Sequence, residues 1–471
     1  MLNQMATAIA SPDSIQAQNM KQAQFVLIGF SLFIGFSLLI GAGRFIAPIF
    51  PAGSLAVGVF LYLKAPVLYT GFTWWLWFVS PVVRRIIDYQ SGYFTPGTWI
   101  LAALLVTGIS VVGFVRQLPK IQQQGGLPFI LSFMGIAYGF VIGLIQNPIT
   151  LQSIIVLLDW INPICFGFFL FINWRDYPAQ RRMIEQVFLW GVLVTGVYGI
   201  YQFLVAPGWD KFWIEYVNDT ADVPSFGTPE PLGIRVSSTL GSPQSFGNVI
   251  VAGLPLLFNG SGVLHLAAIA FGSLSFLLSL ARAAWLGLAV AMLSLTPLLK
   301  IRSQVRLLII LALAMATIVP LVSMEPFADV INSRVESLAD AKYDGSLNAR
   351  TDGYSVLLGK VLVEFIGKGL GGTIDTAGTG FVLGDSTIFP ILISLGWMGT
   401  LPYLFGLVLI LFKLVQKRKY SDEFNSATFA AILGILAQTG FNNILVGIPA
   451  MALWSYLGIN LAAYKYYSNP K

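Results

Sequence analysis

The sequence predicts an all-α, polytopic membrane protein with about 12–14 transmembrane helices. Hydrophobic residues make up 56% of the 471 residues, charged residues make up only 10%, and the mean hydropathy is +0.77. Soluble domains carry about 25% charged residues, so the chain does not belong to that class. Hydrophobic runs of membrane-spanning length recur from end to end. We therefore expect residues 1–471 to form a single integral-membrane domain.

The candidate spans follow one another along the whole chain. Several of them are short or contain proline, so the expected number is a range and not one value. In order, they lie near 24–43, 46–63, 66–83, 98–115, 127–147, 151–173, 184–205, 244–259, 262–280, 283–299, 306–323, 386–412, 426–441 and 447–464.

The basic residues predict the orientation of these spans. With the N-terminus in the cytoplasm, 16 lysines and arginines fall in inner segments, while the short outer segments contain only Arg44, Arg84, Arg85 and Arg282. Cytoplasmic segments of membrane proteins are enriched in Lys and Arg. Both termini are therefore expected in the cytoplasm.

This topology places two long loops outside, at about 206–243 and 324–384. Together they hold most of the 21 acidic residues, which predicts folded segments in water and not linkers. The second loop contains "TDGYSVLLGKVLVEFIGKG", in which Tyr354, Leu358, Val361 and Phe365 recur at helical spacing. This pattern predicts an amphipathic helix that lies along the outer membrane surface.

The rare residue types exclude several kinds of site. The single cysteine, Cys165, excludes a disulfide within the chain and a cysteine-based metal cluster, and the single histidine excludes a histidine-rich metal site. That histidine, His265, lies near the inner end of a span and is interpreted as a packed residue. The net charge of +6 reflects topology, so no nucleic acid is expected as a partner. We expect neither a metal nor a cofactor.

Two further features have structural and functional interpretations. "GKGLGG" at 367–372 matches G-x-G-x-x-G, but it follows a predicted amphipathic helix and not a strand. We interpret it as a helix stop followed by a turn. Asp159 lies in the middle of a predicted span, where an ionisable residue is either functional or paired with an interior polar group. The sequence leaves both interpretations of Asp159 open.

Three outer arginines and one outer aspartate are the candidate site residues. Each of Arg235, Arg282 and Arg350 could by itself pair with the acidic loops. Together on one face they suit a diphosphate, because the guanidinium fork matches phosphate oxygens and keeps its charge. Asp385, at the start of a predicted span, could act as general base for an incoming hydroxyl, or it could cap the following helix.

Four sequence segments carry a resemblance to a known family. They are "RVSSTLGSPQSFGN", "SLARAAWLG", "SLNARTDGYSVLL" leading into "GKGLGG", and "GDSTIFPILISLGWMGTLPYLF". Between about residues 150 and 465 the chain resembles the O-antigen ligase and O-antigen polymerase family of bacterial envelope proteins. Members of this family resemble C-type integral-membrane glycosyltransferases, which use a lipid-diphosphate-linked glycan as donor.

The resemblance implies roles for the candidate residues. Arg282 and Arg350 would bind the donor diphosphate, with Arg235 as a third candidate, and Asp385 would be the catalytic residue. The implied partners are a polyprenyl-diphosphate-linked oligosaccharide, an acceptor glycan and membrane lipids, together with a flippase and a chain-length regulator. The implied location is the bacterial plasma (inner) membrane, crossed several times, with no metal or cofactor.

The departures from the family pattern decide between its activities. Family ligases usually have His-Asn where this chain has Asp385 and Ser386, and His265 lies on the other side of the membrane. Family members also often have a glutamate before the first glycine of a G-x-x-G motif that follows this pair. Here that motif begins at Gly396, and Ser394 and Leu395 precede it. These differences favour a polysaccharide polymerase. The alternatives are ligase-like transfer of glycan to a lipid or protein acceptor, and a role in bicarbonate transport, proposed for some cyanobacterial members.

Overall fold

The chain folds as helices throughout the part that the structure describes. The computed structural model describes residues 12–94, 100–146, 148–220, 226–258, 260–299, 354–355, 357–372, 386–417 and 422–469, with a few more between 301 and 316. Within these residues the single β pairing is an isolated bridge between Gly227 and Ile234. The predicted all-α fold class is confirmed.

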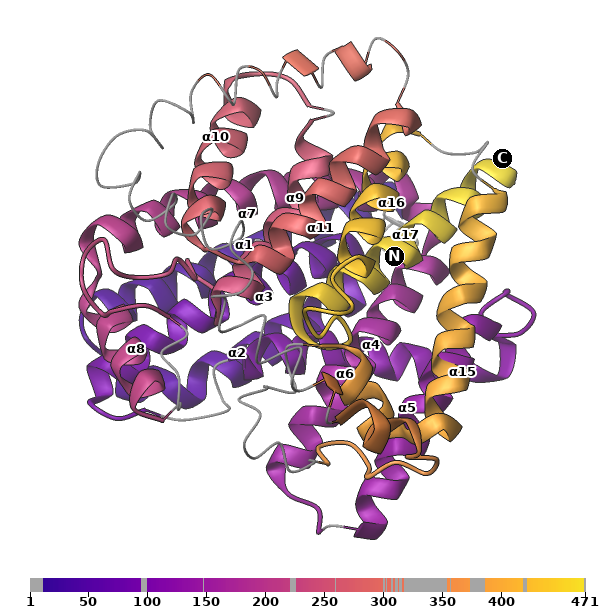
Figure 1. The fold of residues 1–471 in the computed structure, drawn as a ribbon. Helices are drawn as coiled ribbons and strands as arrows, with labels where there is room; N and C mark the ends of the chain where they lie inside the picture. Colours follow the sequence, from indigo (N-terminus) through magenta and orange to yellow (C-terminus); the bar gives the residue numbers. More distant parts are fainter. Residues whose placement is uncertain are drawn as a thin grey trace, which may run out of the picture.

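The principal helices are as follows. They are α1 (Pro12–Leu39), α2 (Gly43–Lys64), α3 (Pro66–Ser91), α4 (Leu101–Gln117), α5 (Leu127–Gln146), α6 (Leu151–Ile172), α7 (Tyr177–Val205), α8 (Gly208–Thr220), α9 (Pro243–Leu257), α10 (Val263–Leu278), α11 (Arg282–Leu295), α15 (Ile388–Gln416), α16 (Glu423–Leu436) and α17 (Gly447–Ser468) (Figure 1).

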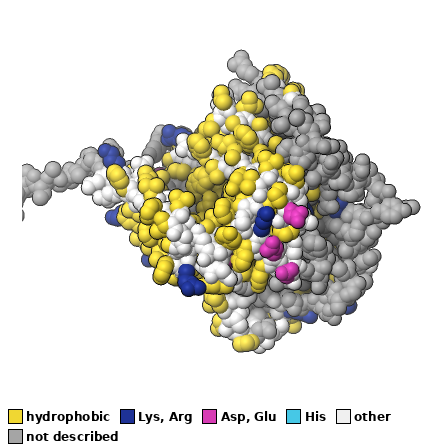
Figure 2. Space-filling view, turned by 90° about the vertical axis from the view of Figure 1, so that its left-hand side faces the viewer, with side chains coloured by type: hydrophobic (Ala, Val, Ile, Leu, Met, Phe, Trp, Pro, Cys, Tyr) yellow, Lys and Arg dark blue, Asp and Glu magenta, His cyan; other side chains and the backbone are white. Residues whose placement is uncertain are grey.

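Among the described residues, seven helical segments are long and apolar enough to cross a membrane. They are Gln18–Leu39, Gly43–Lys64, Leu101–Lys120, Leu127–Gln146, Leu151–Ile172, Trp174–Val205 and Ile388–Gln416. Large apolar side chains on these helices face outward, such as Leu39, which is 86% exposed, and Phe45, which is 74% exposed. Among the side chains that are coloured by type in Figure 2, hydrophobic ones predominate and few are charged. Such a surface suits lipid and not water.

Short polar side chains fix the beginnings of three helices. Thr150 accepts the backbone N–H of Ser153 at 3.1 Å at the start of α6, and Ser242 accepts that of Ser245 at 3.0 Å at the start of α9. Asp422 accepts the N–H of Asn425 at 2.8 Å at the start of α16. Each oxygen satisfies a backbone donor that has no partner within its own helix.

A stripe of glycines allows α5 to pack closely along α15. Gly135, Gly139 and Gly143 recur every fourth residue on α5 and therefore share one face. A Cβ on Gly135 would collide with the carbonyl oxygen of Gly399 on α15. Small residues at fourfold spacing let membrane helices approach backbone to backbone.

Helix α15 is broken at Gly396, which has φ 56° and ψ −175°. A segment from the loop before the helix satisfies backbone groups on both sides of the break (orange in Figure 1). Lys368 N–H donates to the Ile393 carbonyl at 2.7 Å, and Trp397 N–H donates to the Glu364 carbonyl at 3.3 Å. Helices break where their hydrogen bonds find other partners.

The break changes the interpretation of the predicted span 386–412. The part after the break, Trp397–Gln416, is about 30 Å long at 1.5 Å per residue and can cross a bilayer alone. The part before it, Ile388–Leu395, is mostly buried against other segments. The predicted span corresponds to α15, but its apolar composition did not predict the break at Gly396.

Two other sequence expectations need correction, and two fall outside the described residues. Helix α3 extends to Ser91, so Arg84 and Arg85 lie on a helix and not in a short loop. The helical stretch of the second loop ends at 362, so Phe365 lies beyond it and is 62% exposed. The predicted span 306–323 and the loop 324–384 lie largely outside the described residues.

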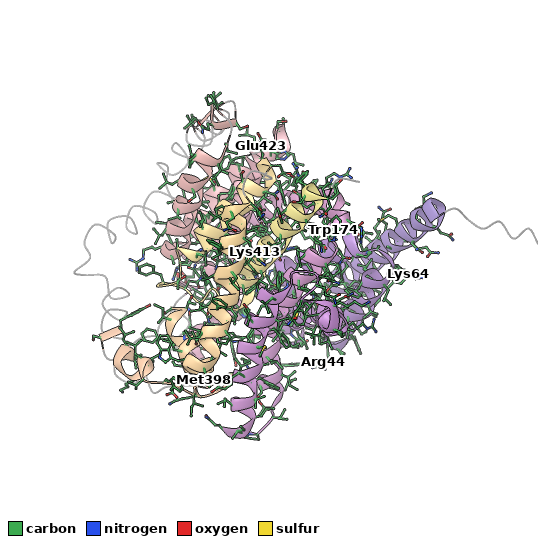
Figure 3. All side chains as sticks on the ribbon, turned by 90° about the vertical axis from the view of Figure 1, so that its right-hand side faces the viewer. Arg44, Lys64, Trp174, Met398, Lys413 and Glu423 are labelled. Atoms are coloured by element: carbon green, nitrogen blue, oxygen red, sulfur yellow. The ribbon has the colours of Figure 1, made fainter. Side chains whose placement is uncertain are left out.

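The labelled residues of Figure 3 lie at different heights along the helices. Arg44 and Met398 lie toward the lower end, whereas Trp174, Lys413 and Glu423 lie above them. Arg44 at the start of α2 was predicted on the outer side, and Lys413 on the inner side. Figure 3 therefore separates these two residues along the molecule, and their placement on opposite sides of a membrane stays a prediction.

Candidate functional site

Arg235 and Arg282 lie around one corner of the structure, the turn between α10 and α11. Arg282 is the first residue of α11. The Nη2 atom of Arg235 donates to the carbonyl of Leu280 in this turn at 3.3 Å, and Val236 N–H donates to the Leu278 carbonyl at 3.1 Å. Both arginine side chains are half-buried. The structure thus brings two of the three predicted arginines to the same turn.

The backbone of this corner is strained at two positions. Leu280 has φ 53° and Ser238 has φ 55°, a region that residues with a Cβ rarely adopt. Ser238 is held there by its N–H, which donates to Gln202 Oε1 at 2.8 Å, and by its hydroxyl, which donates to the Thr195 carbonyl at 2.6 Å. Such conformations cost roughly 1–3 kcal/mol and persist only where the surroundings enforce them.

A buried ion pair holds the strained loop against the helices. Arg85 Nη1 lies 2.7 Å from Asp210 Oδ1, and the two side chains are 2% and 0% exposed. Arg85 Nη2 also donates to the Ser238 carbonyl at 2.5 Å, and the Tyr198 hydroxyl donates to Asp210 Oδ2 at 2.9 Å. Burial raises the pKa of the Asp210 carboxyl, an effect that the Arg85 guanidinium opposes. The pair connects α3 and α8 to the loop that carries Arg235.

No sequence pattern predicts the ion pair between Arg85 and Asp210. Arg85 resembles any outer positive charge, and Asp210 resembles any other acid of the first loop. Their pairing depends on the position of α8, whose Trp213 and Ile214 pack with apolar residues in a small core of their own. The other members of this core are Ala206, Phe226 and Ile234. The described residues of this first loop, 206–220 and 226–243, are folded, as predicted.

We expect Asp210→Asn to destabilise the protein by roughly 3–5 kcal/mol, because it leaves Arg85 as a buried charge without its counterion. Thermal unfolding of the purified protein measures this loss. The matched control is Glu185→Gln, which breaks a partly exposed pair at 3.0 Å with Arg181 and should cost less than about 1 kcal/mol. Equal effects of the two substitutions would refute the structural role assigned to Asp210.

A second polar cluster surrounds the start of α15. Ser386 is fully buried, and its Oγ lies 2.7 Å from the hydroxyl of Tyr354, which donates to the Gly440 carbonyl at 3.1 Å. The Thr387 hydroxyl donates to the Asn442 carbonyl at 2.7 Å. The segment before α15 is therefore fixed against the turn that follows α16.

Asp385 and Arg350 lie outside the described residues. The neighbour of Asp385 is informative nevertheless. Ser386 Oγ accepts the N–H of Ile388 at 3.1 Å and so takes one of the free backbone donors at the start of α15. A carboxylate at Asp385 is not required for that particular bond.

Hydrogen bonds and helix packing connect the two clusters. Gln244 in the first turn of α9 donates to Gln438, two residues after the end of α16, at 2.9 Å. The backbone of α16 at Gly434 packs against Gly287 of α11, five residues after Arg282. The carbonyl of Thr439, the residue after Gln438, accepts the N–H of Thr387 at 2.9 Å. The ends of α9, α11, α15 and α16 therefore form one candidate site.

The glycine motif at 367–372 has a packing role. Gly367, Gly369 and Gly371 all have φ between 80° and 87°, which confirms the predicted turn. Leu370 N–H donates to the Gly139 carbonyl at 3.1 Å, and a Cβ on Gly369 would collide with the backbone of Gly143. The glycines are needed for this close approach to α5.

Asp159 has a structural partner. Its Oδ1 accepts the N–H of Gly447, the first residue of α17, at 3.0 Å. Of the two interpretations that the sequence left open, the structure supports the pairing with an interior polar group. His265 lies in the first turn of α10, at the opposite end of that helix from Leu280.

No group of three His, Cys, Asp or Glu side chains that could hold a metal ion occurs in the described parts of the chain. No family model, curated protein or solved structure matches the sequence. The function is therefore argued from the site itself.

Proposed function

We propose that this protein is a polysaccharide polymerase that extends a glycan at the outer face of the bacterial plasma membrane. The donor is a polyprenyl-diphosphate-linked oligosaccharide and the acceptor is a hydroxyl of another glycan. The observation that carries the proposal is the placement of Arg235 and Arg282 around one rigid turn. Two arginines at one turn suit the two phosphates of such a donor, because each guanidinium can donate forked hydrogen bonds to phosphate oxygens.

The proposed reaction is an inverting glycosyl transfer. The acceptor hydroxyl attacks the anomeric carbon, the bond from that carbon to the diphosphate oxygen breaks, and the polyprenyl diphosphate leaves. The arginines neutralise the charge that develops on the leaving group. Asp385 takes the proton of the acceptor hydroxyl as general base. Arg350 is the third proposed diphosphate ligand.

The proposed arrangement of the protein in the membrane follows from the distribution of lysines and arginines along the chain. Both termini lie in the cytoplasm, the chain crosses the membrane several times, and the site faces outward. Donor units would then arrive through a flippase, and a chain-length regulator would determine when extension ends. The proposal requires no metal or cofactor.

Reconstitution of the purified chain in lipid vesicles tests the activity. Polyprenyl-diphosphate-linked oligosaccharides extracted from native membranes should be converted to a ladder of products, with release of polyprenyl diphosphate at each step. A single transfer to a lipid or protein acceptor, without a ladder, would instead support the ligase. Uptake of labelled bicarbonate by the vesicles without release of diphosphate would contradict glycosyl transfer.

A further inference from the structure

A polar cavity lies where the ends of α5 and α6 meet the glycine turn at 367–372. Its volume is about 350 Å³, and the residues lining it include Gln146, Thr150, Gln152, Ser153, Val156 and Lys368. Small-molecule sites have volumes of roughly 300–1,000 Å³, so the cavity can hold a small ligand.

The described lining combines one cation with neutral hydrogen-bonding groups and contains no carboxylate. Thr150 and Ser153 already hydrogen-bond each other in the cap of α6, at 2.9 Å between their hydroxyl oxygens. The Lys368 ammonium and the Gln152 carboxamide are therefore the groups that define the ligand. They match a molecule with several hydroxyls and one negative charge, because a carboxamide both donates and accepts hydrogen bonds.

The backbone that presents Lys368 is held on both sides. Its N–H donates to the Ile393 carbonyl of α15, and the Gly367 carbonyl accepts from Gln146 Nε2 at 3.4 Å. The hydrogen bond from Leu370 to Gly139 of α5 anchors the other side. A cation on a fixed backbone loses less conformational freedom when a ligand binds.

Helix α15 connects the cavity to the candidate catalytic site. Ile393, which holds the backbone of Lys368, comes seven residues after Ser386 in the sequence. Within α15, Ile388 and Ile393 are separated by about 7.5 Å along the axis at 1.5 Å per residue, and Ser386 lies two residues before Ile388. The cavity and the candidate catalytic site therefore adjoin the two ends of one short helical segment.

We propose that this cavity is a subsite for an acidic sugar residue of the acceptor glycan, with its carboxylate paired to Lys368. This inference rests on the proposed polymerase function and specifies the substrate class. A charge-assisted hydrogen bond from Lys368 would give the acidic sugar its advantage over a neutral one.

Isothermal titration of the full-length protein in phosphatidylcholine nanodiscs tests the subsite without any donor. The probes are cellobiuronic acid and cellobiose, which differ by one carboxylate. We expect the acidic probe to bind about tenfold more tightly, a difference of about 1.4 kcal/mol. Lys368→Gln should remove the difference and Lys368→Arg should keep it. Val156→Trp, which fills the cavity, should weaken both probes.

The matched control is Lys360→Gln, because Lys360 is exposed and does not line the cavity. Equal affinity of the two probes, or an unchanged preference in Lys368→Gln, would overturn the subsite. So would loss of acidic-probe binding when phosphatidylglycerol replaces part of the lipid, since the cavity would then bind a lipid headgroup. Glycosyl transfer is measured separately, by release of polyprenyl diphosphate. A result that disproves the subsite can therefore be distinguished from one that disproves the polymerase activity.

Discussion

Replacement of Arg282 by alanine is expected to reduce chain extension by at least about a hundredfold, in the range seen when one charge-stabilising donor is removed from an active site. Arg282 begins α11, directly after the turn whose Leu280 carbonyl accepts a hydrogen bond from Arg235. The loss should appear as reduced release of polyprenyl diphosphate. Thermal unfolding should remain near that of the unmodified protein.

Two further variants make this test specific. Arg282→Lys should restore only a small part of the activity, because an ammonium cannot donate the forked pair of hydrogen bonds. Arg182→Ala should leave activity unchanged, since Arg182 lies at the start of α7 and bonds to its own helix at Pro178. Full activity of Arg282→Ala would remove this residue from the mechanism.

Asp385→Asn should lower chain extension by about a hundredfold or more while donor binding is retained. A positioned base is worth on the order of a hundred- to ten-thousand-fold, and asparagine cannot accept the proton. Asparagine caps a helix about as well as aspartate does. The same substitution therefore separates a base from a cap.

The control for this second test is Ser386→Ala. Ser386 provides a cap bond to Ile388 and a contact to Tyr354, so its loss should cost about 0.5–2 kcal/mol of stability without a comparable loss of rate. Activity is compared at a temperature where both variants are folded. A fully active Asp385→Asn protein would show that Asp385 is not the base.

The sequence predicted the positions of the helices better than it predicted how they pack. Span 151–173 corresponds to α6 at Leu151–Ile172, because a continuous apolar run between polar ends has one stable form in lipid. Span 386–412 corresponds to α15 at Ile388–Gln416, but the break at Gly396 was not predicted, because it depends on hydrogen bonds to a segment before the helix. Hydropathy reports that a segment avoids water, not which surface it packs against.

The candidate site was partly predictable in the same sense. The charge and geometry of a guanidinium are properties of the residue, so residue type and predicted topology are enough to select Arg235 and Arg282 as candidate phosphate ligands. The buried Arg85–Asp210 pair is not accessible in this way, since the two residues are 125 positions apart in the sequence and each also resembles an ordinary surface charge.

The sequence by itself determined the all-α membrane class and the position of most helices, because these depend on composition and local periodicity. Only the tertiary structure decided that Arg235 reaches the turn before Arg282, that Gly396 breaks α15, and that Lys368 lines a cavity beside α5 and α6. Each of these depends on contacts between segments distant in sequence. Such contacts are selected by close packing and hydrogen bonding of the whole chain, which no local pattern records.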